Sequence, residues 1–292
     1  MNLKIACVAP AACILGEGPV WDEQGGFVWW VDIKGPALHR YRPAGGEVRC
    51  WDLPEPVGAA ALRTRGGLLL ALQRGFAFFE PETGQLERLY DPEPQSPQNR
   101  LNDGKCDALG RFWVGSMHDP VQVPSGHLYR LDPDLDLERF DMGFMVTNGP
   151  AWSGDGRTFY FTDTAGRRIY AFDFDMAAGR LGARRLFVEV PRAEGLPDGQ
   201  CVDAEDHVWT AHWNGGRVTR YRPDGTVERV VRLPAPLVTS CCFGGEDLST
   251  LYVTTARVGL EPAAIEAAPL SGGLFAVTGL GVRGRPSPRF AG

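Results

Sequence analysis

Short runs of aromatic and aliphatic residues recur six times along the chain, and each is bounded by polar turn residues. Each run is followed by a second segment in which apolar and polar residues alternate before Pro, Asp or Gly, a pattern typical of hairpin strands. The central residues of the six runs are spaced 40, 44, 47, 49 and 43 residues apart. They are Trp30, Leu70, Val114, Phe161, Thr210 and Val253. Six copies of a strand-rich unit at this period predict the blades of a β-propeller.

The expected fold is therefore all-β: a six-bladed β-propeller with four-stranded antiparallel blades around a central channel. The last repeat, at 273–278, is short, so an N-terminal strand at roughly 3–8 is expected to complete its blade and close the ring. Closure of that kind removes exposed sheet edges. One helical turn is expected at 261–268, inside a loop. No linker or change of composition divides the sequence, so residues 1–292 are expected to form a single domain.

Composition narrows the possible partners and the compartment. Glycine (37 residues) and proline (23) suit many short strands and tight turns, and the net charge of −6 gives no reason to expect a nucleic-acid partner. No stretch approaches the roughly 20 apolar residues of a membrane helix. The apolar N-terminus carries a single early charge, Lys4, and is broken by Pro10, which is unlike a signal peptide. Seven irregularly spaced cysteines favour a reducing compartment, so we expect a cytoplasmic protein.

A further segment precedes each of the six runs and ends in a Gly- or Asp-containing turn. In a propeller the first strand of each blade lines the central channel, so equivalent positions on these strands converge on the axis. Counting back from the turn aligns five residues, and Asp103 falls one residue out of step. The five are Glu17, Gly58, Asn148, Asp198 and Thr239.

Four of these positions offer hard oxygen atoms: Glu17, Asp103, Asn148 and Asp198. Carboxylates crowded together repel one another, and burying them without partners is costly. A divalent cation would relieve that cost, and an all-oxygen set favours Ca²⁺, Mg²⁺ or Mn²⁺ over a structural zinc site. Asp-Gly and Asn-Gly are also ordinary turn signals. The match of four such residues to one position of a six-fold repeat favours the metal site.

Two residues near this ring are further candidates. Arg100 adjoins the Leu101-Asn102 segment and is expected to contact substrate, although an arginine in such a position is more often an ordinary surface residue. His118 lies at the end of a strand near the proposed top face, where it could line the site. The nucleophile elbow, the zinc-protease helix and the phosphate-binding loop are all missing as sequence motifs.

Several sequence blocks, in order along nearly the whole chain, resemble the SMP-30/gluconolactonase/luciferin-regenerating-enzyme family. They are Leu15-Gly16-Glu17-Gly18-Pro19, Asn99-Arg100-Leu101-Asn102-Asp103-Gly104-Lys105, Thr147-Asn148-Gly149-Pro150, Leu196-Pro197-Asp198-Gly199 and Leu251-Tyr252-Val253-Thr254-Thr255. Within the family the chain is most similar to bacterial sugar lactonases such as xylonolactonases.

The resemblance implies a six-bladed propeller with one divalent metal ion held by Glu17, Asn148 and Asp198. The ion would be Ca²⁺, Fe²⁺, Zn²⁺ or Mn²⁺. The same three residues emerge from the alignment of the repeats.

The resemblance also implies a substrate site. The family's substrate-contacting Arg and Asn fall on Arg100 and Asn102, and Asp103 fits its residue near the metal. A further substrate-contacting Glu of animal members has no clear counterpart, because the sequence there is Met117-His118-Asp119. His118 is kept as a substrate-binding candidate, and the loop 119–126 is expected to form part of a lid.

The implied activity is metal-dependent hydrolysis of a sugar (aldono) lactone, such as xylonolactone or gluconolactone, to the open-chain acid. Asp198 would be the general base. The expected partner is the small-molecule lactone, with no nucleic acid, membrane or obligate protein partner. Two alternatives remain, a broader metal-dependent esterase and a non-catalytic metal-binding propeller, because propellers host unrelated functions.

Overall fold

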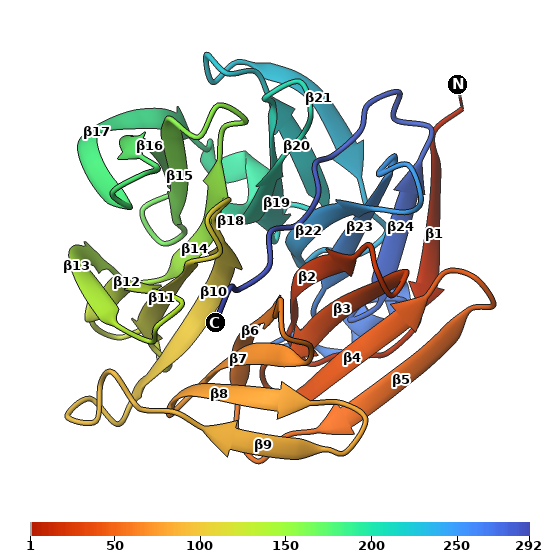
Figure 1. The fold of residues 1–292 in the computed structure, drawn as a ribbon. Helices are drawn as coiled ribbons and strands as arrows, with labels where there is room; N and C mark the ends of the chain where they lie inside the picture. The colour runs from red at the N-terminus through yellow and green to blue at the C-terminus, as the bar shows by residue number, and fades with distance from the viewer. Residues whose placement is uncertain (1) are drawn as a thin grey trace.

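The chain forms six four-stranded antiparallel sheets arranged as blades around a central axis (Figure 1). The computed structural model describes residues 2–292, apart from the side chain of Asp141. The predicted all-β, six-bladed propeller is confirmed. Each of the six apolar runs forms the second strand of a blade, next to the strand that lines the axis.

The blades follow one another along the chain. The first contains β2 (Gly16–Asp22), β3 (Phe27–Asp32), β4 (Ala37–Arg42) and β5 (Glu47–Asp52). The second contains β6 (Val57–Leu62), β7 (Leu68–Leu72), β8 (Gly75–Glu80) and β9 (Gln85–Arg88). The third contains β10 (Asn99–Cys106), β11 (Phe112–His118), β12 (Gly126–Leu131) and β13 (Leu137–Phe144). The fourth contains β14 (Thr147–Trp152), β15 (Thr158–Asp163), β16 (Arg168–Asp175) and β17 (Arg180–Glu189). The fifth contains β18 (Leu196–Val202), β19 (Val208–Trp213), β20 (Arg217–Tyr221) and β21 (Val227–Arg232).

The sixth blade joins the two ends of the chain. It contains β22 (Val238–Gly244), β23 (Thr250–Thr255), β24 (Leu274–Thr278) and, as its outer strand, β1 (Lys4–Ala9). Lys4 pairs with Thr278, so the predicted closure of the ring by the N-terminal strand is confirmed. The expected helical turn is α1 (Pro262–Ala267), which lies between β23 and β24, and a 3-10 turn, η1 (Arg192–Glu194), precedes β18.

The hydrophobic core lies between blades rather than on the axis. Every residue of β3, β7 and β11 is buried, because neighbouring blades cover both faces of these strands. One apolar cluster joins Trp209 of the fifth blade to Phe275 of the sixth, and another joins Trp113 of the third to Phe159 of the fourth. Most large apolar side chains therefore pack between the blades, and several innermost strands present polar residues to the axis, although β6 is apolar throughout.

The last residues of the chain, 279–292, run back across the ring (Figure 1). Backbone hydrogen bonds tie them to the turn of the sixth blade at Leu248 (2.8 Å), to Leu62 of the second blade (2.7 Å) and to Gly110 of the third (3.0 Å). Arg289 forms an ion pair with Asp22 of the first blade. The Ala204 N–H of the fifth blade also donates to the carbonyl oxygen of Arg283 at 2.8 Å, so the segment fastens five blades together from one end of the channel. Among the described residues, no helix is long and apolar enough to cross a membrane.

Candidate metal centre

The innermost strand of every blade has an irregularity in its hydrogen-bonding ladder at the position where the sequence predicted a shared site. In four blades two residues of the inner strand oppose one residue of its neighbour: Gly18-Pro19, Asn102-Asp103, Gly149-Pro150 and Asp198-Gly199. In the other two blades a single extra residue has no counterpart, Gly58 or Thr239. A β-bulge interrupts the regular alternation of side chains, so it can re-aim one of them.

The ladder also refines the predicted alignment. Glu17 and Asn148 come directly before the two bulged residues of their strands, whereas Asp198 is the first of such a pair and Asp103 the second. The matched position predicted from the turns is therefore a window of a few residues. Gly18 and Gly149 adopt φ values of 54° and 59°, a left-handed conformation that glycine takes without strain.

The three carboxylates at this position are buried. Glu17 is 6% exposed, Asp103 2% and Asp198 4%. Glu17 Oε2 accepts the backbone N–H of Gly18 at 3.0 Å, and Asp103 Oδ2 accepts that of Gly149 at 2.8 Å. Asp103 Oδ1 and Asp198 Oδ1 have no hydrogen-bond partner among the described residues. Buried acceptors without partners are costly, which points to a missing ligand.

The charges of these residues act on one another. Burial, reinforced by the negative charge of Asp103, raises the pKa of Glu17 to about 8. Burial, reinforced by Glu17 and Asp103, raises the pKa of Asp198 well above its usual range. The three carboxylates, from the first, third and fifth blades, thus share one electrostatic environment, as their convergence on the axis predicts. Glu17, Asp103 and Asp198 together form the acidic group at the centre of the ring.

Asn148 completes the oxygen set, and its amide is held by two neighbours. Its Nδ2 donates to Thr164 Oγ1 at 2.9 Å, and its Oδ1 accepts from Asn102 Nδ2 at 2.9 Å. Since an amide oxygen has two lone pairs, one remains for a ligand. The oxygens of Glu17, Asn148 and Asp198 are hard donors, and a cation would provide the missing partner for the bare Asp198 oxygen. The residues present therefore fit a divalent metal ion.

Arg100 and Asn102 belong to a chain of polar contacts beside this group. Arg100 donates from Nε to Asp119 Oδ1 at 2.6 Å and from Nη1 to the Asn102 carbonyl oxygen Oδ1. Lys34 donates to the other oxygen of Asp119 at 2.6 Å. Although burial raises the pKa of Asp119, Lys34 and Arg100 outweigh it and lower that pKa. The network connects Lys34, through Asp119, Arg100 and Asn102, to the proposed metal ligand Asn148.

Sequence reasoning missed part of this network. Lys34 follows the second strand of the first blade and carries no motif, and the sequence places Asp119 beside His118 at the start of the expected lid loop without indicating its contacts with Arg100 and Lys34. His118 is buried, and both of its ring nitrogens are engaged: Nε2 donates to Gln98 Oε1 at 2.7 Å and Nδ1 accepts the N–H of Gln122 at 3.2 Å. These bonds hold the start of the 119–126 loop. A substrate contact by His118 stays a prediction.

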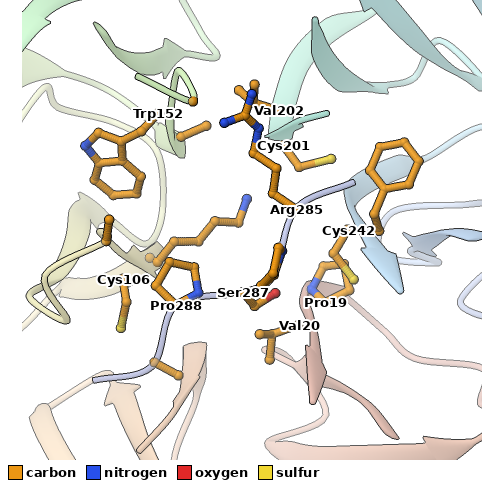
Figure 2. Close-up of a pocket in the computed structure, with 18 of the residues that line it drawn as sticks. Pro19, Val20, Cys106, Trp152, Cys201, Val202, Cys242, Arg285, Ser287 and Pro288 are labelled. Atoms are coloured by element: carbon orange, nitrogen blue, oxygen red, sulfur yellow. The ribbon is translucent and has the colours of Figure 1, made fainter. Parts of the chain in front are cut away.

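A separate cavity of about 290 Å³ lies beneath the C-terminal segment and is lined in part by residues that follow the three carboxylates on the inner strands (Figure 2). Figure 2 shows Arg285, Ser287 and Pro288 crossing it, with Trp152 and Cys242 on its walls. The proposed metal ligands do not line it, although Gly18 and Gly104, which directly follow Glu17 and Asp103, do. The cavity and the acidic group are therefore distinct features of the channel.

Comparison with known proteins identifies the family. Residues 15–257 match the family model described as the SMP-30/Gluconolactonase/LRE-like region. The chain belongs to the SMP-30/gluconolactonase/LRE-like family. A regucalcin of Oryctolagus cuniculus is 38% identical over 297 residues, which covers 100% of this chain and 99% of the relative.

Solved structures of the family agree. A luciferin-regenerating enzyme superposes with a TM-score of 0.93 at 29% identity, over 99% of this chain and 100% of that one. A calcium-binding protein, regucalcin, from Agrobacterium tumefaciens also has a TM-score of 0.93, at 32% identity, over 97% of this chain and 96% of the other. The resemblance seen in the sequence blocks is thus confirmed for the family and for the fold.

Proposed function

We propose that this chain hydrolyses a sugar (aldono) lactone, such as xylonolactone or gluconolactone, to the open-chain sugar acid, using one divalent metal ion held by Glu17, Asn148 and Asp198. The observation that carries the proposal is the buried acidic group, in which Asp198 Oδ1 lacks a partner among the described residues. Membership of a family whose description includes gluconolactonase supports the reaction class. The Agrobacterium relative, a calcium-binding protein, supports the presence of an ion.

When bound, a metal ion here would polarise the lactone carbonyl and lower the pKa of an adjacent water. Asp198 is the proposed general base: a carboxylate oxygen takes a proton as the water oxygen bonds to the carbonyl carbon. The ring C–O bond then breaks, and the proton passes from Asp198 to the departing ring oxygen. One water is consumed, and the product is a hydroxy acid.

Substrate orientation is assigned to the polar network beside the group. Since Nε and Nη1 of Arg100 are held by Asp119 and Asn102, Nη2 is left to bind a sugar hydroxyl or the lactone oxygen. Asn102, Asp103 and His118 are proposed to contact the remaining hydroxyls. The 119–126 loop, anchored through Asp119, is proposed as part of the lid.

The test is acid release from a panel of aldonolactones by chelator-stripped protein, with single divalent ions restored. We expect metal-dependent turnover that Asp198→Asn reduces at least about 100-fold, in line with the loss of a general base. Asp224→Asn, at an exposed turn, is the matched control and should keep the wild-type rate. Metal binding without turnover of any lactone would overturn the proposal and favour a non-catalytic metal-binding protein. Equal rates on aryl esters would indicate a broader esterase. The cytoplasmic location stays a prediction.

A further inference from the structure

A second group of metal-binding side chains lies on one face of the first blade, away from the axis. Trp30 on β3 stands opposite His39 on β4, and His39 stands opposite Cys50 on β5. Residues directly opposite one another on neighbouring strands point to the same side of a sheet. Cys13, from the connection between β1 and β2, packs against this face and is buried.

The ligand atoms are at metal-binding separations. One atom each from Cys13, Asp32 and His39 lie within 4.8 Å of one another. Cys13 Sγ is 3.7 Å from His39 Nε2, and Cys50 Sγ is 4.0 Å from the same nitrogen. In a tetrahedral zinc site with the usual bond lengths, a sulfur and a nitrogen ligand are about 3.6 Å apart. An adjustment of a few tenths of an ångström would bring Cys13 Sγ to that separation from His39, whereas Cys50, which falls outside the three-residue group, has to move further toward it to serve as the fourth ligand.

His39 lacks the partners that a buried histidine normally has. It is 8% exposed, its Nδ1 has no hydrogen-bond partner among the described residues, and its Nε2 faces only the two sulfurs. Its ring stacks on Trp30 with the centroids 4.9 Å apart, so its orientation is set by packing. Burial lowers the pKa of His39, which favours the neutral imidazole that metals bind.

Asp32 retains a free position for a ligand. Its Oδ1 accepts the backbone N–H groups of Leu15 and Gly35, both at 2.9 Å, whereas its Oδ2 accepts only that of Ile14, at 2.7 Å. Because a carboxylate oxygen has two lone pairs, Oδ2 can accept one more partner. The three backbone bonds fix the carboxylate in place.

We propose that Cys13, Asp32, His39 and Cys50 form a second metal site, selective for a borderline-soft divalent cation such as Zn²⁺. Thiolate and imidazole ligands favour zinc, whereas the central group offers only hard oxygens, so the two sites select different ions. Cys50 is exposed and gives the ion a route from solvent. Burial raises the pKa of Cys13 to about 12, and the indole N–H of Trp30, 3.5 Å from Cys13 Sγ, opposes that rise, so a bound cation is what would hold the sulfur as a thiolate.

The position of Cys13 suggests what the site does. The connection between β1 and β2 passes from the sixth blade to the first, where the ring closes. A metal that binds Cys13 together with residues of β3, β4 and β5 would clamp this closure. Metal sites that join separate segments contribute to folding stability.

The probe is Co²⁺, added to the reduced, chelator-stripped full chain while the absorption spectrum is followed. A saturable sulfur-to-cobalt charge-transfer band that Zn²⁺ removes is expected, and the all-oxygen central group cannot produce this band even where it also binds Co²⁺. Cys50→Ser, at an exposed position, should roughly halve the band and weaken the competition by Zn²⁺ about 10-fold or more, because a ligand is lost. The Cys13→Ser/Cys50→Ser double variant should lack the band.

Two controls separate this site from other thiols and from the central group. Cys7→Ser removes a partly buried cysteine of β1 and should leave the band unchanged, as should Glu17→Gln. Circular dichroism checks that each variant is folded. A wild-type protein without the sulfur band, or a band of equal strength in the folded double variant, would overturn the proposal.

Discussion

We expect Glu17→Gln to stabilise the folded chain when metal is absent and to gain much less stability than wild type when metal is present. Glutamine keeps the shape and an acceptor for the Gly18 N–H but removes the charge. The pKa of Glu17 is about 8 in the folded chain against an ordinary value of 4.5. As pH rises from 4.5 to 8, the unfolded chain releases this proton first, so the metal-free folded chain loses stability across that window. At pH 7 the loss is about 3 kcal/mol, at 1.36 kcal/mol per unit.

The assay is urea unfolding of wild type and Glu17→Gln at pH 7, once in chelator and once with excess Ca²⁺. In chelator the variant should be more stable than wild type by about 1 to 3 kcal/mol. The lower figure applies if the wild-type chain reduces the repulsion among Glu17, Asp103 and Asp198 in another way. With Ca²⁺ at about 1,000 times its dissociation constant, wild type should gain about 4 kcal/mol and the variant much less. Glu87→Gln, at an exposed residue of β9, should change stability by less than about 0.5 kcal/mol in both conditions.

One result would refute this reasoning. If Glu17→Gln were less stable than wild type in chelator and still gained the full stabilisation from Ca²⁺, Glu17 would be a structural carboxylate with its own protein partner. The shared electrostatics of the acidic group would then have another explanation, and the metal would bind elsewhere.

Three further predictions test other parts of the molecule. Arg100→Lys loses the forked contact to Asp119 and Asn102, so KM for a lactone should rise about 10-fold with a smaller change in kcat, measured by steady-state kinetics. Burial lowers the pKa of His212 from 6.5 to about 4, so the unfolded chain takes up this proton first and the folded chain loses stability as pH falls from 6.5 to 4. His212→Gln should reduce that loss of stability by up to about 3 kcal/mol. An unchanged dependence of thermal unfolding on pH would contradict this. Asp203→Ala leaves Arg220 with weaker partners and should lower the free energy of unfolding by about 3 kcal/mol. Calorimetry of wild type and variant also tests the domain organisation. One transition in each is expected if residues 1–292 are a single domain, and two separable transitions would contradict it.

The sequence alone determined the repeated part of the fold. Strand patterning and turn residues are local signals, so six copies at a steady period sufficed to predict six blades and the closing strand at the N-terminus. The same repetition predicted that Glu17, Asn148 and Asp198 converge, because equivalent positions on inner strands meet at the axis whatever their separation in sequence. The structure bears out the fold and the shared electrostatics of Glu17 and Asp198, and the metal itself stays a prediction.

Tertiary structure decided what repetition does not encode. The placing of Asp103 and Asp198 within their bulges depends on ladder register, which the turns locate only to within a residue or two. The contact of Lys34 with Asp119 joins residues 85 positions apart. The final segment, 279–292, has no periodic sequence pattern from which its path across the ring could be predicted. The Cys13 and His39 pairing arises in the same way, from a connection folded against a blade face. Each of these depends on long-range packing, in which the partner is set by the shape of the assembled ring rather than by neighbouring residues.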